Sequence, residues 1–405
     1  MYIIDTNVLL DYPNVLEEFD DIMILTDVLK ELDGLKLNIN TEVAFKARRA
    51  AVVLTRHYDE ITWNSYYEND KMSVDDKIIA AAGSVHVIVT NDVYLKVKAK
   101  IKDVKTRGYK IEDDYTGIRT VEVELDENGY NDWLNYIYEN EAFSDKFKTY
   151  NNEFIFVVDK NKTEDNLLAI FQNKNGVVKS VHRDRIIKNK WIDTICPRNP
   201  EQKCLFQALY DDDISILYAG GQWGCGKSFI LNNFALQQLE KGKIRKIVYI
   251  PNNALTENTM DIGALPGDVL EKVVGQIGPL IDLVGIDEIN RMLGREELEV
   301  VPMSYIRGRS FTDSIVIVNE AQNLTEDHMK LLIGRCGKGS RIFFDGDFKQ
   351  SDNFIFRNKN GLQLLLKLRK SEKFSKLFGT VRLNKIERSI TAQAASYLDE
   401  ITGSI

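Results

Sequence analysis

Eight consecutive residues near the middle of the chain have the composition of a phosphate-binding loop. Residues 221–228 read Gly-Gln-Trp-Gly-Cys-Gly-Lys-Ser and lie between an apolar run and a stretch whose apolar residues recur at helical spacing. Glycines allow backbone conformations that a side chain would forbid, so successive N–H groups can converge on phosphate oxygens at a helix N-terminus. The loop therefore predicts binding of a nucleoside triphosphate, with ATP as the cofactor. The alternative is a glycine turn without a ligand.

The expected roles of the loop residues follow from their chemistry. Lys227 would neutralise the outer phosphates, and the Ser228 hydroxyl would ligate Mg²⁺. Gly221, Gly224 and Gly226 would let the backbone approach the phosphates closely. We expect these five residues to form the core of the nucleotide site.

Four carboxylates in the first hundred residues form a second candidate site. Asp5 and Asp92 each follow an apolar run typical of a buried strand, and parallel sheets gather ligands at the carboxyl ends of their strands. Glu31 lies in a helical stretch, and Asp76 begins another helix, where capping is the alternative role. Carboxylates brought together repel one another unless Mg²⁺ or Mn²⁺ neutralises them, and such a metal would activate water for phosphodiester hydrolysis. Acidic residues at strand ends are also common on ordinary surfaces.

Composition indicates an ordinary globular protein of 405 residues, long enough for two or three domains. We recognise no membrane-spanning run or export signal, and four scattered cysteines are typical of a reducing compartment, so we expect a cytoplasmic protein. The net charge of −8 argues against a uniformly basic nucleic-acid surface. Seven basic residues between positions 96 and 110 are either a local nucleic-acid patch or a solvated helix face.

Strand and helix patterns divide the chain into three parts. Residues 1–115 alternate short apolar strands with helical stretches, which predicts an α/β domain with a parallel sheet. Residues 116–190 are richer in strand-like runs and turns, which indicates a small β-rich connector. Residues 191–405 return to strand and helix alternation around the phosphate-binding loop. The predicted fold class is therefore α/β, with one domain on each side of the connector.

The first part resembles the PIN-domain nucleases in four ordered motifs. These are Ile-Asp-Thr-Asn-Val-Leu-Leu at 4–10, Val-Leu-Lys-Glu-Leu-Asp at 28–33, Asp-Lys-Ile-Ile at 76–79 and Val-Thr-Asn-Asp at 89–92. The resemblance implies that the metals that cut RNA are coordinated by Asp5, Glu31, Asp76 and Asp92. It also implies that Thr6 or Asn7 orients these carboxylates. Asp75 is an additional candidate because it adjoins Asp76.

The last part resembles the PhoH-like ATPases, a branch close to superfamily 1 helicases with a RecA-like P-loop fold. The family-typical strings lie at 197–202, 261–268, 305–310, 320–323 and 346–350. The resemblance implies that Gln202 reads the adenine edge, Glu320 polarises the attacking water and Gln350 senses the γ-phosphate. Arg335 and Arg388 resemble arginine fingers, and a structural ion pair is the alternative for each.

One position departs from the family pattern. The family has an aspartate before the catalytic glutamate, and this chain has Asn319 there. The amide keeps an oxygen acceptor but loses the charge that would hold Mg²⁺. ATP would then bind normally while turnover falls, unless the contact runs through water and tolerates the amide.

The two resemblances occur in the order known for PIN–PhoH fusion proteins, including phage-encoded relatives that would act in the host cytoplasm. They imply an ATP-dependent RNA helicase or translocase that feeds single-stranded RNA to a divalent-metal-dependent endoribonuclease. Relatives assemble as rings, so we expect a homo-oligomer, a hexamer, without membrane association. The alternatives are a nucleotide-gated RNA-binding protein with weak ATPase activity, suggested by Asn319, and a motor with a vestigial nuclease.

Overall fold

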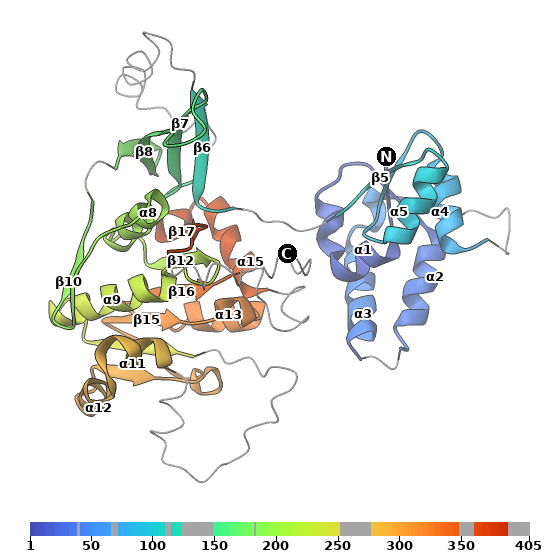
Figure 1. Ribbon diagram of the computed structural model, residues 1–405. Helices are drawn as coiled ribbons and strands as arrows, with labels where there is room; N and C mark the ends of the chain where they lie inside the picture. The colour runs from blue at the N-terminus through green and yellow to red at the C-terminus, as the bar shows by residue number, and fades with distance from the viewer. Residues whose placement is uncertain are drawn as a thin grey trace. The chain divides into compact units, whose positions relative to one another are not determined.

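The computed structural model describes residues 1–38, 41–65, 72–109, 115–123, 149–181, 184–251, 277–347 and 360–387 (Figure 1). The chain forms two compact units, Met1–Glu112 and Asp113–Ile405. Each unit has its own buried apolar core. No helix in the described ranges is both long enough and apolar enough to cross a membrane.

The first unit is built on a five-stranded parallel sheet with the strand order β3-β2-β1-β4-β5. Its strands are β1 (Tyr2–Ile4), β2 (Ile22–Leu25), β3 (Ile61–Asn64), β4 (Val87–Val89) and β5 (Lys105–Arg107). Because β1 and β4 are parallel neighbours, the residues that follow them meet at one edge of the sheet. Asp5 and Asp92 both lie at this edge.

Helices connect the strands of this sheet. They are α1 (Thr6–Asp11), α2 (Thr26–Leu35), α3 (Thr41–Arg56), α4 (Val74–Ala82) and α5 (Val93–Ile101), with the 3-10 turns η1 (Pro13–Glu17) and η2 (Tyr58–Glu60). Asp5, Ser73 and Asp92 are the N-caps of α1, α4 and α5, and each accepts a backbone N–H from the first turn of its helix. Two of the candidate carboxylates therefore also begin helices.

A four-stranded mixed sheet opens the second unit. β6 (Ile118–Val123) pairs in parallel with β7 (Phe154–Asp159), and β8 (Leu167–Lys174) and β9 (Val177–Ser180) continue it antiparallel. An antiparallel pair of strands follows, β10 (Ile187–Asn189) and β11 (Ile192–Ile195). The expected β-rich segment is confirmed, and it belongs to the same compact unit as the large sheet that follows it.

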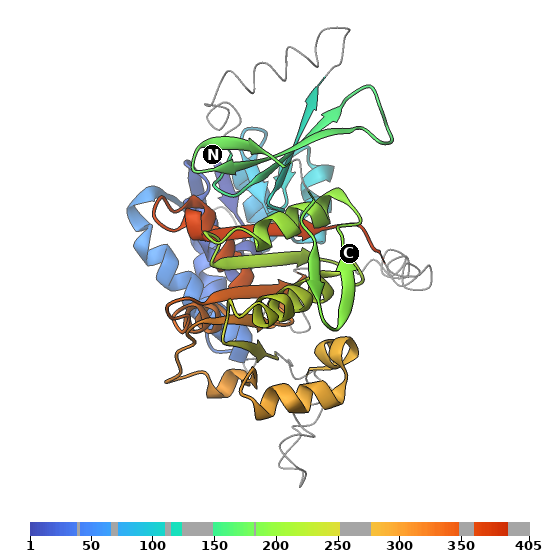
Figure 2. The ribbon, with the colours of Figure 1, turned by 90° about the vertical axis from the view of Figure 1, so that its left-hand side faces the viewer.

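The large sheet has six parallel strands in the order β14-β13-β15-β16-β12-β17. They are β12 (Ile216–Gly221), β13 (Lys246–Ile250), β14 (Leu298–Val300), β15 (Ser314–Val318), β16 (Arg341–Gly346) and β17 (Phe378–Leu383). Figure 2 shows red β17 toward one edge and the orange helices α11 and α12 beyond the other. Nearly all residues of the central strands are buried, as expected for a sheet covered on both faces.

Two layers of helices cover this sheet. The helices are α8 (Pro200–Leu209), α9 (Lys227–Glu240), α11 (Gly278–Val284), α12 (Ile286–Gly294), α13 (Glu326–Ile333) and α15 (Gly361–Leu366), with the 3-10 turns η3 (Met303–Tyr305), η4 (Ala321–Asn323), η6 (Lys367–Lys370) and η7 (Ser375–Leu377). Strand residues alternate between the layers: Leu217 belongs to the core with α8 and α9, and Tyr218 belongs to the core with α13 and α15. The predicted α/β fold is thus confirmed.

Candidate functional site

The phosphate-binding loop joins the buried strand β12 to the N-terminus of α9. Gly221, Gly224 and Gly226 have φ values of 129°, 80° and 94°, which residues with a side chain rarely adopt. A Cβ atom on Gly221 would lie 2.0 Å from the carbonyl oxygen of Leu383, in the neighbouring strand β17. The glycines therefore serve both the loop conformation and the close packing of the strands.

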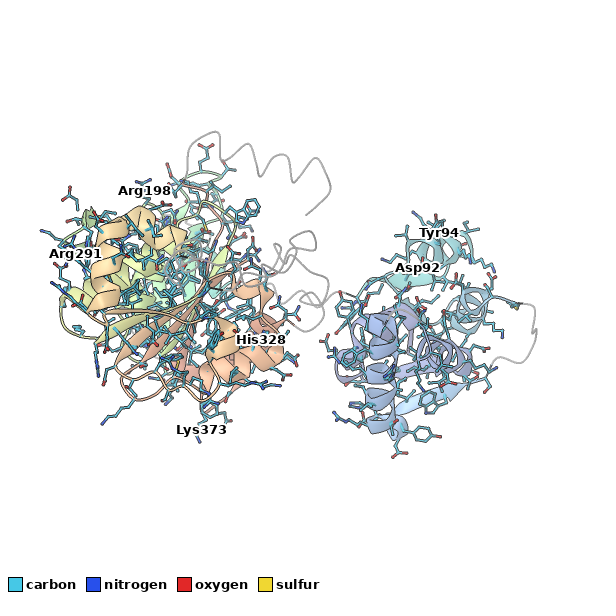
Figure 3. All side chains as sticks on the ribbon, turned by 90° about the horizontal axis from the view of Figure 1, so that it is seen from below. Asp92, Tyr94, Arg198, Arg291, His328 and Lys373 are labelled. Atoms are coloured by element: carbon cyan, nitrogen blue, oxygen red, sulfur yellow. The ribbon has the colours of Figure 1, made fainter. Side chains whose placement is uncertain are left out.

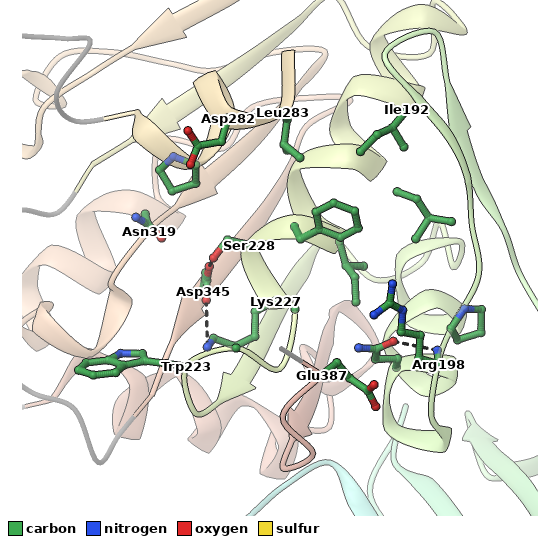
Figure 4. Close-up of a pocket in the computed structure, with 18 of the residues that line it drawn as sticks. Ile192, Arg198, Trp223, Lys227, Ser228, Asp282, Leu283, Asn319, Asp345 and Glu387 are labelled. Atoms are coloured by element: carbon green, nitrogen blue, oxygen red, sulfur yellow. Dashed lines mark hydrogen bonds and ion pairs between the residues drawn. The ribbon is translucent and has the colours of Figure 1, made fainter. Parts of the chain in front are cut away.

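Lys227 and Ser228 begin α9 and both contact Asp345 of strand β16 (Figure 4). The Lys227 ammonium donates hydrogen bonds to the carbonyl oxygens of Gly221 at 2.7 Å and Gln222 at 3.0 Å. It also lies 3.8 Å from Asp345 Oδ1, while the Ser228 hydroxyl donates to Asp345 Oδ2. Burial raises the pKa of Asp345, and the neighbouring Lys227 and Ser228 partly offset this rise.

A cavity of about 910 Å³ opens at this loop. Its walls bring the loop together with the residues that follow β15, Asn319 and Glu320, and with Asp345 and Asp347 of the β16 end. Side chains from β11 and from α11, among them Ile192 and Asp282, complete the wall (Figure 4). The volume suits a nucleotide-sized ligand.

Glu320 has a left-handed backbone, with φ 50°, at the turn between β15 and η4. The Gln322 amide donates a hydrogen bond to Glu320 Oε2, and Gln322 Oε1 accepts the Asp347 N–H at 3.2 Å. This network links the end of β15 to the end of β16. Strain at a non-glycine residue of this kind is frequent at functional sites.

Gln202 forms hydrogen bonds to the phosphate-binding loop and to the residues that precede its own helix, α8. Its Nε2 donates to the carbonyl oxygen of Cys225 at 3.0 Å, and its Oε1 accepts the Arg198 N–H at 2.9 Å. Asn199 caps the same helix and donates to Glu387 at 2.8 Å. Gln202 also lines the cavity, and because an amide has two N–H donors and two oxygen lone pairs, one protein bond at each end leaves it able to contact a ligand as well.

Several expected site residues lie elsewhere. Gln350, Arg388 and the string 261–268 fall outside the described residues. Arg335 follows α13, where its carbonyl oxygen accepts the Phe311 N–H at 2.9 Å, and the described cavity lining does not include it. Sequence reasoning missed Asp345, and it included Asp347 only within the string 346–350, without a role of its own. Their signal was present, because both carboxylates stand at the carboxyl end of an apolar run beside the loop strand.

In the first unit, Asp5 is buried at the end of β1. Its Oδ1 accepts the Thr6 N–H at 2.7 Å, and its Oδ2 accepts the Thr90 hydroxyl at 2.6 Å. Burial raises the pKa of Asp5 to about 6, and the negative charges of Asp75 and Glu31 add to the rise. Asp5 therefore lies within electrostatic reach of two other carboxylates.

Thr6 and Thr90 connect Asp5 to two other candidate residues, Glu31 through its carboxylate and Asp92 through its backbone N–H. The Thr6 hydroxyl donates to Glu31 at 2.6 Å, and the Thr90 hydroxyl accepts the Asp92 N–H at 3.0 Å. Asp92 itself caps α5 by accepting the Tyr94 N–H at 2.7 Å, and Figure 3 labels both residues. Asn7 also contacts Thr90, with 3.3 Å between its amide nitrogen and the hydroxyl oxygen.

Asp76 and Asp75 point to different partners. Asp76 exchanges hydrogen bonds with Ser73 in a capping box, and Lys102 lies 3.7 Å away, so the pKa of Asp76 is lowered, chiefly by the Ser73 bond. Asp75 pairs with Lys98 at 2.8 Å and is the member of the two that raises the pKa of Asp5. Ser73 is thus the N-cap of α4 and Asp76 lies three residues after it, so metal binding by Asp76 stays a prediction.

The four expected metal ligands are all described, yet they do not form a closed metal site in this structure. Within the described ranges no group of three or more His, Cys, Asp and Glu side chains is gathered closely enough to hold a metal ion. The physical reason is that each carboxylate already has protein partners: hydroxyls, helix N–H groups or lysines. Metal binding would have to draw these side chains closer.

Fold and sites together define the class: a P-loop ATPase domain that follows a PIN domain. The PhoH-like protein family matches residues 194–396, and the PIN domain family matches residues 2–110. The chain belongs to the PhoH-like protein family and carries an N-terminal PIN domain. Both expectations from the sequence motifs are confirmed.

Several known proteins are similar to different shares of this chain. Protein PhoH2 of Bacillus subtilis is 27% identical, over 98% of this chain and 99% of its own length. Protein PhoH2 of Mycolicibacterium smegmatis is 32% identical, over 51% of this chain and 47% of its own length. Among solved structures, the Pif1 helicase from Candida albicans is 17% identical over 51% of this chain and 44% of that chain, with a TM-score of 0.27.

Proposed function

We propose that this protein is an ATP-dependent RNA helicase or translocase coupled to a divalent-metal-dependent endoribonuclease. The observation that carries the proposal is the cavity that Lys227, Ser228 and Glu320 line together at the phosphate-binding loop. Glu320 lies about ninety residues after the adjacent Lys227 and Ser228, and each of the three has the chemistry that a step of phosphoryl transfer needs.

In the nucleotide site, Lys227 would exchange its bonds to the Gly221 and Gln222 carbonyls for bonds to the outer phosphates of ATP. Bonds to an anionic oxygen are stronger than bonds to a neutral carbonyl, so the exchange favours the bound nucleotide. Ser228 offers a hydroxyl oxygen to the Mg²⁺ ion, which would neutralise charge on the transferring phosphate. Glu320 would orient the attacking water and accept its proton.

In the nuclease site, Asp5, Glu31, Asp92 and either Asp75 or Asp76 would hold Mg²⁺ or Mn²⁺. The donor chemistry fits, because these cations prefer carboxylate oxygens. The raised pKa of Asp5 points the same way: burial beside Asp75 and Glu31 disfavours its anion, and a cation would reverse that. The bound metal would supply an activated water for attack on the phosphodiester.

Single-stranded RNA would be the shared substrate. Tyr94 supports this, because it is 80% exposed two residues after Asp92, where an unpaired base could stack on its ring (Figure 3). Lys100 is also exposed on α5, available to a phosphate group. By the family resemblance, the motor would work as a hexameric ring that passes the strand to the nuclease.

The test is cleavage of labelled RNA with Mn²⁺, with and without ATP, by the full chain and two variants. Asp5→Asn should abolish cleavage and keep ATP hydrolysis, because it removes charge from the metal site only. Lys227→Ala should abolish ATP hydrolysis and still cut short unstructured RNA, while duplex-containing RNA becomes resistant. Cleavage of both RNAs at the wild-type rate by Lys227→Ala would show that the motor does not feed the nuclease. Undiminished cleavage by Asp5→Asn would remove the nuclease assignment.

Two observations favour alternative functions in which either the ATPase activity or the nuclease activity is reduced. Asn319 favours a nucleotide-gated RNA-binding protein with weak ATPase activity, since the family's magnesium-facing charge is absent at that position. The ion pairs of Lys98 with Asp75 and Lys102 with Asp76 favour a motor with a vestigial nuclease, since lysines neutralise carboxylates that a metal would need. ATP turnover with and without RNA tests the first, and RNA integrity after incubation with Mn²⁺ tests the second.

A further inference from the structure

Asn319 and Asp345 occupy matching positions on two neighbouring strands. β15 and β16 pair in parallel with Val318 opposite Phe344, so the next residue of each strand is Asn319 and Asp345 respectively. On its other side, Asp345 pairs with Ala219 of β12, the strand that leads into the phosphate-binding loop. Asp345 is therefore one strand closer to the loop than Asn319.

The Asp345 carboxylate is directed at the two residues of the loop that act on phosphate and metal. Ser228 donates its hydroxyl hydrogen to Oδ2, and the Lys227 ammonium lies 3.8 Å from Oδ1 (Figure 4). A hydroxyl that donates its hydrogen keeps its oxygen lone pairs available to a cation. Asp345 thus orients the Ser228 oxygen for metal binding while it brings a negative charge to the same point.

A buried negative charge is energetically unfavourable unless a positive charge or a hydrogen-bond donor lies beside it. Asp345 is 3% exposed, and an isolated buried carboxylate would lose several kcal/mol of hydration. Lys227 and Ser228 compensate part of this loss in the nucleotide-free protein. When Lys227 turns to the phosphates of a nucleotide, the carboxylate needs another positive neighbour, and a divalent cation bound with the nucleotide provides one.

We propose that Asp345 supplies the magnesium-facing carboxylate of the nucleotide site, in place of the residue that Asn319 replaces. In the family the negative charge follows the strand equivalent to β15, and in this chain it lies on the neighbouring strand β16. The nucleotide site therefore still has a carboxylate for the metal. This inference rests on the proposed nucleotide function of the loop. Under this inference Asn319 is no longer an argument for weak ATPase activity, because Asp345 supplies the charge that Asn319 lacks.

The test compares the affinity of the full chain for ATPγS with excess Mg²⁺ and with EDTA, by calorimetry. The readout is the ratio of the two affinities, which measures the magnesium contribution independently of hydrolysis. Asp345→Asn should lower this ratio by about tenfold or more, since the amide loses the charge that attracts the cation. Affinity in EDTA should stay equal or rise, because Lys227 loses a competing carboxylate.

A double variant and a matched control sharpen the result. Asp345→Asn combined with Asn319→Asp should recover most of the ratio, because the charge returns to the matching position of β15. Asp159→Asn removes another buried carboxylate, in β7 and outside the described cavity lining, and should keep the ratio. Because Asn can still accept the Ser228 hydroxyl, the fold should persist, and the melting temperature checks this.

A folded Asp345→Asn protein that keeps the wild-type ratio would overturn the assignment, and so would a folded double variant that fails to recover it. If Asp345→Asn does not fold, Asn319→Asp alone decides. It should raise the ratio less than about threefold when Asp345 already faces the metal, whereas a tenfold rise would show that the site lacked a carboxylate. Absence of ATPγS binding to the wild-type protein under both conditions would instead count against the nucleotide site itself.

Discussion

The Lys77 ammonium lies 2.8 Å from Asp27 Oδ1, and this ion pair joins helix α4 to helix α2 inside the PIN domain. Both side chains are 9% exposed. Glu31 lies one helical turn after Asp27, and Asp75 and Asp76 directly precede Lys77. The pair therefore holds α2, which carries Glu31, in a fixed position relative to α4, which carries Asp75 and Asp76.

Replacing Lys77 with Met should destabilise the PIN domain by about 3 kcal/mol, because Asp27 would keep a largely buried charge without its closest cation. Hydrogen exchange of the full chain, read at the core of the first unit, measures this free energy of opening. The matched control is Lys36→Met, which breaks the exposed pair with Asp33 and should change stability by less than about 0.5 kcal/mol. Equal losses in the free energy of opening would show that the buried pair stabilises the domain no more than the exposed pair does.

The same pair should make the stability of the PIN domain depend on acid. The hydrogen bond from Lys77 holds the pKa of Asp27 below its ordinary value of 3.8. A carboxyl whose pKa is lowered by folding stabilises the fold above the unfolded-state pKa, and this contribution is lost as the pH falls through the folded-state pKa. The stability difference between wild type and Asp27→Asn should therefore shrink from about pH 5 to about pH 3. A constant difference over this range would contradict the shift.

Gly221→Ala should disrupt the nucleotide site through the backbone. The new Cβ would lie 2.0 Å from the Leu383 carbonyl oxygen, and φ of 129° is unfavourable for alanine. We expect a loss of about 3 kcal/mol or more and loss of ATP binding. Gly242→Ala is the matched control, with φ of 63° and no neighbour within 4 Å, and should cost about 1 kcal/mol. Chemical denaturation of both variants measures the difference, and similar losses would rule out the contact with β17 as the cause.

Gln202→Ala should weaken ATP and GTP binding by the same factor, about tenfold, which corresponds to about 1.4 kcal/mol. The reason is that the Gln202 amide holds the Cys225 carbonyl and the Arg198 N–H, so its loss loosens the loop whatever base is bound. Equilibrium binding of both nucleotides is the measurement. A loss confined to ATP would mean that Gln202 reads adenine, as the family resemblance implies.

Lys98→Met and Lys102→Met distinguish Asp75 from Asp76 as the metal ligand. Each lysine neutralises one of these carboxylates, Lys98 at 2.8 Å from Asp75 and Lys102 at 3.7 Å from Asp76. Removing the lysine that competes with the metal should lower the Mn²⁺ concentration for half-maximal RNA cleavage by about threefold. We expect this effect for Lys98→Met, because Asp75 is the carboxylate that acts on Asp5. The reverse order would assign the metal to Asp76.

Local patterns in the sequence were sufficient for much of the fold and part of the site. The phosphate-binding loop is eight consecutive residues whose glycines, lysine and serine act through their own backbone and immediate neighbours, so its place between β12 and α9 could be predicted. Asp5 and Asp92 follow apolar runs, and parallel strands bring such residues to one edge. The loop prediction depends on short-range geometry, and the prediction for Asp5 and Asp92 depends on the general rule that parallel strands end at the same edge of a sheet.

Only the tertiary structure decided which side chains meet. Asp345 faces Ser228 because β16, more than a hundred residues later, inserts between β12 and β15, and strand order is set by long-range packing. Asp75 and Asp76 are adjacent in sequence, yet successive helix residues point about 100° apart, so helix orientation decides which of them affects Asp5. The contact of Gln202 with the loop has the same origin: Cys225, 23 residues later in the phosphate-binding loop, lies beside Gln202 only in the folded chain.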